Sequence, residues 1–450
     1  MGFMLISNIV SLIIFLGVYM YIYKNYSTLI FVFFYLFFGY LSMVVSVFYL
    51  DFGGKYSFEL SKFSVQSNSL VTLSLFYLST IFLFLLWYRL RIPQFKQYSS
   101  LNFERSRFYL KPKFILLFLY ATVIYILILY WHLFYSGIPL FLGYGKGEIW
   151  LYSKFKFLQP INNQASTVLL VLGFLYAYIR KYKKNNIAYT KYLFYFKIIL
   201  VLFILYIILM GYKFGGPLLF IFSFFISHLV FLSFDTRFSF RNLAKYIIFF
   251  SLFFVSVVWY VYTNSTFNIG GDTWGLIFDR IFTLQGQIWH FVYNGIVDES
   301  IIPDFSQSTK EFKNIFSNTY SKETGINHVM HLIMPQDRLQ SYLSKGVRLS
   351  GGYPAILLSI SGFSMITFIL HILFSWIIFI LHFKWLYHLV RLNLIKFVLW
   401  FKLAFASKNI IFMGDIHVLF SFENMIYLFI IFAIYLFELS LINQKKLLTS

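Results

Sequence analysis

Cysteine is absent from this 450-residue chain, and charged residues are scarce. Without cysteine the protein forms no disulfide, offers no thiolate to a metal and has no cysteine nucleophile, although an oxidising compartment is not excluded. Only 12% of the residues are Asp, Glu, Lys or Arg, whereas 60% are hydrophobic and 61 are Phe. A water-soluble domain of this length needs far more polar surface, so the composition indicates a multi-spanning membrane protein.

The sequence also lacks the motifs of nucleotide-driven and zinc-dependent chemistry. It contains no GxxxxGK[ST] loop, no HExxH pair, no glycine-rich dinucleotide fingerprint and no GxSxG turn. His328 and His331 are three residues apart and could ligate a metal, but no Glu, Asp or Cys nearby is placed to complete a ligand set. We therefore expect neither a metal nor a cofactor.

Long apolar runs recur along the chain without the alternation of a membrane barrel, which predicts an all-α protein. Eleven spans are predicted, at residues 3–23, 28–50, 68–88, 114–134, 164–180, 193–211, 216–234, 246–262, 352–380, 396–412 and 423–441. The first run has no basic residue before it and no small-residue cleavage site, so we expect a retained span rather than a signal peptide. The spans divide the chain into a first membrane part (1–262), a large polar loop (263–350) and a last membrane part (351–450).

Basic residues are distributed unevenly between the two sides of this arrangement. Of the 37 Lys and Arg residues, 22 lie on one side and 14 on the other, and seven of the 14 belong to the large loop. Because Lys and Arg are enriched in short cytoplasmic loops, we expect the first side and the C-terminus inside, and the N-terminus and the large loop outside. The net charge of +21 then reflects topology, and blocks such as RKYKKNN (180–186) anchor to lipid headgroups rather than bind nucleic acid.

Isolated cations near the ends of predicted spans are the first candidates for chemistry. Lys213 lies in MGYKFGGP, between two apolar runs, where a lone lysine either snorkels to the headgroups or meets a ligand. Arg280 lies in GLIFDRIFTLQGQIWH, which has helical spacing of its apolar residues. If this segment is one helix along the membrane surface, Asp279, Arg280 and Gln287 lie off its apolar face. A surface helix without further function is the alternative.

Further charged groups follow in the large loop and after the tenth predicted span. Five cations precede GGYPA, namely His328, His331, Arg338, Lys345 and Arg348. Such a density of cations suits an anionic substrate such as a diphosphate, which Arg grips with two parallel hydrogen bonds. In KNIIFMGDIHVLFSFEN (408–424), Asp415 and His417 are two residues apart, and from a loop either could act as an acid or a base.

A second outer loop, GYGKGEIWLYSKFK (143–156), combines aromatic rings with charges. Rings that flank polar groups can hold sugars, but interfacial aromatic belts use the same residues. Lys154 of this loop and Tyr353 of GGYPA are included among the candidates for substrate binding.

With these residues in view, the chain resembles the O-antigen polymerases of the Wzy type and, more distantly, the enterobacterial common antigen polymerase. The resemblance covers the whole chain in layout and three segments in detail: MGYKFGGPLLFIF, DRIFTLQGQIWH, and TGINHVMHLIMP followed by GVRLSGGYPAI. At position 213 this chain has Lys where relatives often show Arg, which keeps the charge but loses the bidentate geometry.

The resemblance implies an integral-membrane glycosyltransferase with a C-type fold in the bacterial inner membrane. It implies that undecaprenyl-diphosphate-linked oligosaccharides are joined at the periplasmic face without a nucleotide sugar, with a chain-length regulator as a partner beside the lipid bilayer. The candidate catalytic residues are Arg280, His328, His331, Asp415 and His417. The candidate residues for binding diphosphate or sugar are Lys213, Arg338, Arg348, Gln287, Lys154 and Tyr353.

Two other functions stay open. An O-antigen ligase uses the same donor and shares the large outer loop, so only the local motifs favour a polymerase. A flippase for lipid-linked oligosaccharides, which is a transporter, predicts charges that line a cavity within the spans together with short loops on both sides. Here the predicted spans hold few charges, Lys402 and Glu438, and one loop is long.

Overall fold

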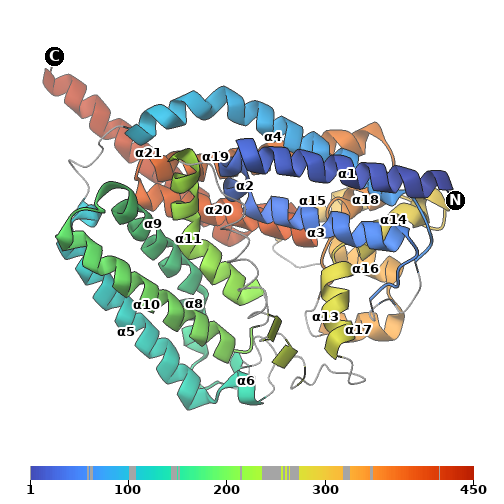
Figure 1. Ribbon diagram of the computed structural model, residues 1–450, viewed down its shortest axis with the longest axis horizontal. Helices are drawn as coiled ribbons and strands as arrows, with labels where there is room; N and C mark the ends of the chain where they lie inside the picture. The colour runs from blue at the N-terminus through green and yellow to red at the C-terminus, as the bar shows by residue number, and fades with distance from the viewer. Residues whose placement is uncertain are drawn as a thin grey trace.

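The computed structural model shows an all-helical chain (Figure 1). It describes residues 2–57, 60, 64–100, 108–142, 149–150, 153–212, 215–235, 255–256, 259–260, 263, 273–317, 325–344, 348–414 and 416–449. The predicted span at 246–262 lies mostly outside these residues.

The first membrane part contains α1 (Gly2–Asn25), α2 (Ser27–Val32), α3 (Phe34–Asp51), α4 (Ser69–Ser100), η2 (Phe108–Leu110), α5 (Pro112–Ser136), α6 (Pro139–Leu142), η3 (Lys156–Leu158), α8 (Gln159–Asn163), α9 (Ala165–Tyr182), α10 (Ile187–Leu209) and α11 (Gly215–Asp235). The large loop contains α13 (Thr273–Phe282), α14 (Gln287–Val297), α15 (Ser306–Ser317), α16 (Ile326–Ile333) and α17 (Gln336–Ser344). The last part contains α18 (Ala355–Ser361), α19 (Met365–Val390), α20 (Leu394–Met413), η4 (Ile416–Phe420) and α21 (Phe422–Thr449).

Eight of the described helical segments are long and apolar enough to cross a membrane. They are Gly2–Asn25, Phe34–Asp51, Ser69–Arg91, Pro112–Leu142, Ile187–Leu209, Gly216–Asp235, Met365–Val390 and Phe422–Ser440. The all-α prediction and the prediction of a polytopic membrane protein are therefore confirmed. The predicted spans at 164–180 and 396–412 form the helices α9 and α20, but neither is among the eight candidates.

The reason that α20 is not among the candidates is its charge, since it carries Lys396, Lys402 and Lys408.

The predicted span at 352–380 is wrong as a single helix. α18 ends at Ser361, Gly362 adopts a φ of +61°, and α19 starts only at Met365. A glycine takes this left-handed conformation without a steric penalty, so the chain can turn between two helices here.

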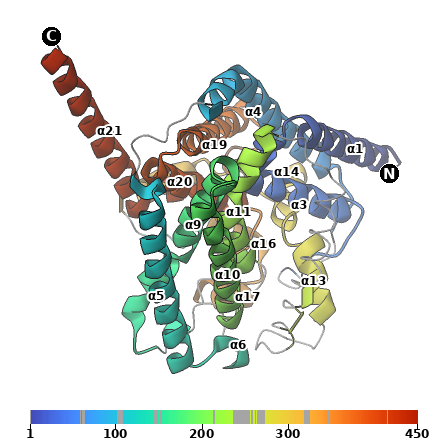
Figure 2. The ribbon, with the colours of Figure 1, turned by 60° about the vertical axis from the view of Figure 1, so that its left-hand side comes forward.

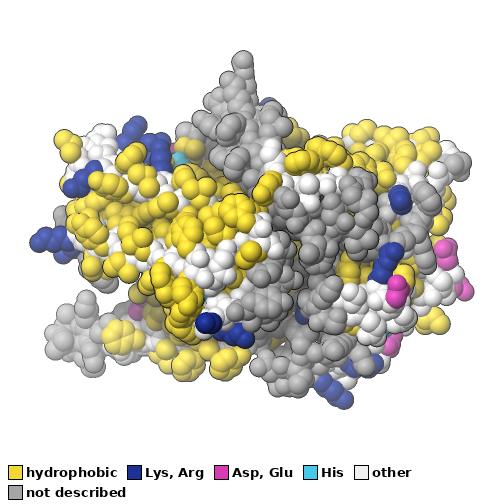
Figure 3. All heavy atoms as spheres, turned by 90° about the horizontal axis from the view of Figure 1, so that it is seen from below, with side chains coloured by type: hydrophobic (Ala, Val, Ile, Leu, Met, Phe, Trp, Pro, Cys, Tyr) yellow, Lys and Arg dark blue, Asp and Glu magenta, His cyan; other side chains and the backbone are white. Residues whose placement is uncertain are grey.

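Lipid-facing surface and protein core are carried by different helices. α1, α5, α10 and α21 expose many large apolar side chains, such as Phe3, Leu117, Phe194 and Phe429. Figure 3 shows hydrophobic side chains over much of the left half of one face, where α5 and α10 lie in Figure 1. α21 packs on α20 and η4, and Figure 2 shows its C-terminal end extending away from the other helices. Exposed apolar faces of this kind suit a hydrocarbon solvent.

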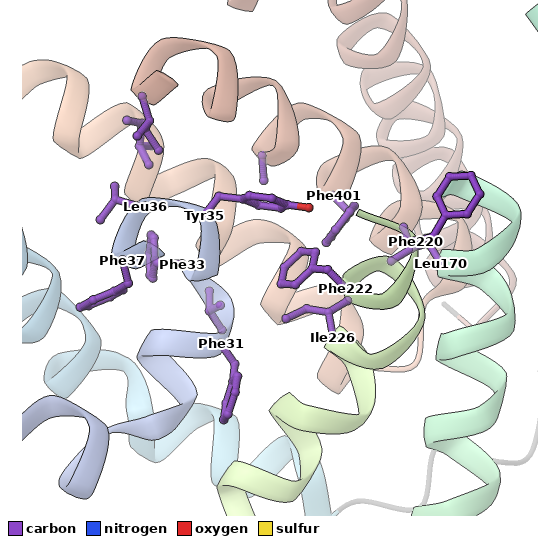
Figure 4. Close-up of a cluster of buried hydrophobic side chains, with 14 of the residues drawn as sticks. Phe31, Phe33, Tyr35, Leu36, Phe37, Leu170, Phe220, Phe222, Ile226 and Phe401 are labelled. Carbon is purple, nitrogen blue, oxygen red and sulfur yellow. The ribbon is translucent and has the colours of Figure 1, made fainter. Parts of the chain in front are cut away.

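Aromatic side chains join the first helices to the later ones in the core (Figure 4). Phe33 lies at the junction of α2 and α3, and its ring stacks on that of Phe84 with centroids 4.4 Å apart. The ring of Tyr35 meets Phe222 of α11 at 4.6 Å and Phe405 of α20 at 4.9 Å. These edge-to-face and stacked contacts bring four segments together that are far apart in the sequence.

The large loop is not a separate appendage, because one of its helices belongs to the core. α14 packs against α3, α4 and α18, and its Ile288, Trp289 and Val292 are fully buried. The prediction of a single surface helix through this region is wrong: α13 ends at Phe282 and α14 begins at Gln287. Gln287 lies in the core rather than off an apolar face, with no exposed surface.

α9 and α11 approach each other closely at Gly173. A Cβ atom at this glycine would lie 2.0 Å from the backbone carbonyl oxygen of Phe224, which is far inside van der Waals contact. Most residues of α9 from Leu169 to Ile179 are buried, so the two helices form the centre of this half of the body. Only glycine permits this packing distance.

We expect Gly173→Ala to force α9 and α11 apart and to lower the stability of the protein by about 1–3 kcal/mol, as overpacked cores do. The measurement is thermal unfolding of the purified protein in detergent. Gly17→Ala in α1 is the matched control, since nothing lies within 4 Å of its added Cβ atom. Equal melting temperatures for the two variants would contradict the packing argument.

Candidate functional site

A cavity of about 680 Å³ lies among α8, α9, α10, α11, α20, η4 and α21. Its wall is rich in groups that both donate and accept hydrogen bonds. Six amide side chains line it, those of Gln159, Asn162, Asn163, Gln164, Asn409 and Asn424. Asn162 and Asn424 are buried, whereas the other four amides are exposed, so the polar wall runs from the surface into a body of apolar helices.

Lys402 of α20 is the cation of this cavity. Its Nζ donates to Gln164 Oε1 at 2.7 Å and to the hydroxyl of Tyr427 at 2.8 Å. Tyr427 in turn donates to the carboxylate of Glu423. The side chain is half-buried, and its Nζ also lies 4.9 Å from the centroid of the Tyr427 ring. Lys402 therefore links α9, which begins after Gln164, to the start of α21.

Several other polar groups of the wall are held by the protein. Asn162 Oδ1 accepts a hydrogen bond from the hydroxyl of Tyr206 at 2.8 Å, and Asn424 Nδ2 donates to the carbonyl of Val418 at 2.6 Å. The hydroxyl of Ser223 differs: it is buried, it lines the cavity, and it has no hydrogen-bond partner among the described residues. A buried hydroxyl without a hydrogen-bond partner lowers the stability of the folded protein, unless a ligand or a water molecule forms the missing hydrogen bond.

A second polar cluster, mostly buried, surrounds His290 of α14. The hydroxyl of Tyr56 lies 2.6 Å from His290 Nδ1, and Asp51 Oδ1 lies 3.3 Å from Nε2. Asn294 Nδ2 lies 3.2 Å from Nδ1 and 3.3 Å from Nε2, so the amide contacts both nitrogens of the ring. Burial and the neighbouring Asp51 raise the pKa of Tyr56 well above its ordinary value, so its phenol stays protonated.

The carboxylate of Asp51 is saturated with donors. Ser67 Oγ and Ser69 Oγ donate to Oδ1 at 2.6 Å and 2.9 Å, and the backbone N–H of Leu70 donates to Oδ2 at 2.8 Å. Asp51, His290 and both serines are buried. The cluster therefore fastens α14 of the large loop to the end of α3 and the start of α4, and it offers no surface to a substrate.

The structure places most of the predicted site residues away from the cavity. Arg280 is exposed on α13, Lys154 is exposed near η3, and Arg338 and Arg348 are half-buried in and after α17. Gln287 Oε1 accepts from Ser57 Oγ at 2.7 Å. Two candidates lie outside the described residues, Lys213 and Asp415, and of His417 only the backbone in η4 is described.

Tyr353 is also buried, and its hydroxyl lies 2.6 Å from Nδ1 of His371 in α19. Nε2 of the same histidine lies 2.8 Å from the carbonyl oxygen of Phe76 and 2.9 Å from the hydroxyl of Thr80, both in α4. These contacts tie the GGYPA segment to two membrane helices. Access of a substrate to Tyr353 is not visible in this arrangement, so its binding role stays a prediction.

His328 and His331 both belong to α16, and both side chains are partly buried. Burial lowers the pKa of His328; Asp304 acts against this effect, whereas Lys310 and His331 add to it. The imidazole of His328 is therefore neutral at pH 7 and can accept a proton. Asp304 is ionised, because hydrogen bonds from Ser306 and Gln307 lower its pKa to about 2. Within the described residues no group of three His, Asp or Glu side chains is arranged to hold a metal.

The cavity residues were not among the sequence candidates. In the sequence, Lys402 was recognised only as a charge inside a predicted span. Such a charge is itself an indication of a functional site, since charges inside spans usually face a polar interior. Its partners Gln164 and Tyr427 lie 238 and 25 residues away along the chain. No spacing in the sequence connects these three positions. Tyr212 and Gly216 line the cavity, and both belong to the MGYKFGGP segment that the sequence analysis singled out.

A family model described as a family of unknown function (DUF6418) matches residues 319–428. This segment runs from the large loop to the start of α21 and includes Lys402, Asn409, Glu423 and Tyr427 of the cavity wall. No curated protein matches the chain. No solved structure matches it either.

We expect Asp51→Asn to destabilise the protein, because an amide nitrogen replaces one of the two oxygens that accept from Ser67, Ser69 and Leu70. One lost acceptor in a buried cluster costs about 1–3 kcal/mol. Thermal unfolding in detergent measures the loss, and faster proteolysis in the large loop would accompany it. Asp298→Asn, at an exposed carboxylate just after α14, is the control and should change stability by no more than about 0.5 kcal/mol. Equal effects would contradict a structural role for the Asp51 cluster.

The pKa of His328 also predicts a pH dependence of stability. Because the folded pKa lies below the ordinary value, the unfolded chain takes up a proton first, and stability falls as the pH drops from about 6.5 toward the folded pKa. His328→Gln should reduce this loss between pH 7.5 and pH 5.5, measured as the difference in melting temperature. At pH 7.5 His328 is neutral in both the folded and the unfolded protein, so the melting temperature at this pH is the internal reference. An unchanged difference in the variant would show that His328 does not titrate as described.

Proposed function

We propose that the protein is an integral-membrane glycosyltransferase with a C-type fold that joins undecaprenyl-diphosphate-linked oligosaccharide repeat units, an O-antigen polymerase. The observation that carries the proposal is the cavity: about 680 Å³ lined by amides, hydroxyls and Lys402 inside a body of apolar helices. Pockets for organic ligands commonly have volumes of about 300–1,000 Å³.

The large loop and the cavity share one end of the helical body, which supports a common substrate. α15 of the loop contacts η4, and Val418 of η4 lines the cavity. The wall also includes the turn region after α10 and the starts of α9 and α21. These helix ends are opposite to the basic residues Arg180, Lys181 and Lys384. By the distribution of Lys and Arg, this end faces the periplasm of a bacterial inner membrane.

The chemistry of the proposed reaction assigns separate tasks to the charged groups. The bond between the anomeric carbon of the growing chain and the diphosphate oxygen breaks, and the electron pair leaves with undecaprenyl diphosphate. Arg280, Arg338 and Arg348 stabilise the charge that grows on this leaving group. The acceptor hydroxyl of the next repeat unit forms the new bond to the anomeric carbon, and its proton passes to a base. Neutral His328 is suited to take this proton.

A chain-length regulator is the expected protein partner, and the surrounding bilayer is the expected lipid partner. The exposed apolar faces of α1 and α21 suit lipid or another membrane protein. The reaction as proposed needs no cofactor, since the donor carries its own diphosphate leaving group.

A flippase for lipid-linked oligosaccharides is the second candidate, and one observation favours it. Lys402 and Glu423 place two charges in a cavity among the helices, which is the arrangement expected for a transport path. The buried helix α14 favours the transferase, because it shows that the long outer loop is built into the body. An O-antigen ligase shares both features and differs only in its acceptor.

The test is the banding pattern of lipopolysaccharide from a strain that lacks this gene, with the wild-type gene returned as the reference. A polymerase predicts loss of the ladder with the core plus one repeat unit retained, because the unit is still exported and ligated. Loss of the single-unit band as well, with accumulation of lipid-linked units, would identify the flippase or the ligase instead.

In the same strain we expect Arg280→Ala to lower polymer formation by about 100-fold or more, the usual effect of removing a donor to a developing charge. Arg280→Lys should keep part of the activity, because the charge remains and the bidentate geometry is lost. Lys197→Ala, at an exposed lysine of α10, is the matched control and should leave the ladder unchanged. A normal ladder from well-expressed Arg280→Ala would remove Arg280 from the site.

A further inference from the structure

We propose that the cavity binds an uncharged, polyhydroxylated saccharide and not the diphosphate of the lipid carrier. The inference rests on the proposed function only in identifying this saccharide with a repeat unit of the substrate. It divides the substrate between two places: sugar in the cavity, diphosphate at the cations of the large loop.

The charges of the wall balance each other. Lys402 and Glu423 are the charged side chains among the described residues that line the cavity, and Tyr427 joins them by hydrogen bonds to both. A di- or trianionic diphosphate would meet one ammonium group that already has two partners, and a carboxylate that repels it. An uncharged ligand meets no such conflict.

The hydrogen-bonding groups of the wall fit hydroxyl groups better than phosphate. Each amide side chain presents a carbonyl acceptor and an NH₂ donor, and a sugar hydroxyl both donates and accepts. Asn162 Oδ1 and Gln164 Oε1 already accept hydrogen bonds from Tyr206 and Lys402. A phosphate dianion only accepts, so it offers no donor to the carbonyl oxygens of the other four amides. A hexose ring with several hydroxyls can donate to these four carbonyl oxygens and accept from amide NH₂ groups of the wall.

Aromatic rings complete the wall, and besides Tyr427 of α21 they come from three further parts of the chain. Tyr212 follows α10, Phe220 belongs to α11, and Phe401 and Phe405 belong to α20. The face of an aromatic ring carries negative charge density, and the C–H groups on the face of a sugar ring are weakly positive. Such rings favour a sugar and repel a phosphate.

Ser223 supplies an observation that is independent of the wall composition. Its hydroxyl is buried, lines the cavity and has no hydrogen-bond partner among the described residues. Ser227, one turn further along α11, is also buried, and its hydroxyl likewise has no hydrogen-bond partner among the described residues. Ser227 is not part of the wall. A ligand in the cavity can therefore form a hydrogen bond with the hydroxyl of Ser223 but not with that of Ser227.

Access to the cavity is provided at its rim. Gln159, Asn163 and Glu423 line the cavity and are exposed at the same time. A soluble probe of modest size can therefore enter from the end of the bundle at which α9 and α21 begin.

The absence of cysteine makes a direct test possible in the full-length protein. Ser223→Cys in detergent is treated with two thiosulfonate reagents of equal size, one anionic and one cationic. A charge-balanced cavity predicts similar rates for both. Lys402→Gln should then favour the cationic reagent, and Glu423→Gln the anionic one, each by about tenfold, the lower end of the effect of a charged cleft on local ion concentration. A strong preference for the anionic reagent in the parent variant would overturn the proposal.

Protection experiments test the ligand class on the same variant. Two probes are compared. One is the repeat-unit oligosaccharide, which is released from the strain's lipopolysaccharide by mild acid and then dephosphorylated. The other is inorganic diphosphate. We expect the oligosaccharide to slow labelling of Ser223→Cys by about tenfold or more, as a ligand that fills most of a pocket does, and diphosphate to have no effect. Ser227→Cys is the matched control and should be insensitive to both. Asn163→Cys at the rim repeats the measurement if Ser223→Cys does not fold.

The outcomes separate this inference from the proposed function. Protection by diphosphate alone, or by neither probe, overturns the saccharide site even if the lipopolysaccharide ladder depends on the gene. Protection by the oligosaccharide supports the saccharide site even in a strain whose ladder survives deletion, and then only the polymerase assignment fails.

Discussion

The structure depends on one constraint: a polar group inside a body of apolar helices must find its partners within the protein, because hydrocarbon supplies none. Lys396 of α20 meets this requirement by pairing with Glu438 of α21. Asp51 meets it with the hydroxyls of Ser67 and Ser69, the N–H of Leu70 and the imidazole of His290. These bonds decide which helices stand together. In the cavity wall, the buried hydroxyl of Ser223 has no such partner among the described residues.

The same constraint explains why the large loop is part of the body. At the junction of α13 and α14, Ser46 of α3 donates to the carbonyl of Thr283 and accepts from the N–H of Gly286. Gly351, directly after the C-terminal end of the loop, lies close to this junction. With a φ of +89°, its Cβ position lies 1.9 Å from the carbonyl oxygen of Gln285, so only glycine fits there. The junction of α13 and α14 thereby lies next to the segment that follows the loop, and α15 of the loop contacts η4, whose Val418 lines the cavity.

Two groups of polar residues emerge, and they differ in chemistry. The large loop contains arginines, such as the exposed Arg280 and the half-buried Arg348, whose guanidinium groups suit an anion. The cavity combines balanced charge with amides and rings, which suits hydroxyl groups. A lipid-linked oligosaccharide has both an anionic diphosphate and neutral sugars, so a single substrate explains why one protein maintains both environments.

The sequence by itself determined the class of the protein: membrane-spanning, all-helical, with one long polar loop in the second half. Apolar runs and scarce charges are local properties, and the bilayer converts them directly into helices. The site was decided only by the tertiary structure. Gln287 has a polar side chain and a polar sequence environment, yet it is buried, since α14 packs into the core. Lys402 reads as an isolated charge, yet it joins Gln164 and Tyr427, because helix packing brings together residues that no periodicity relates.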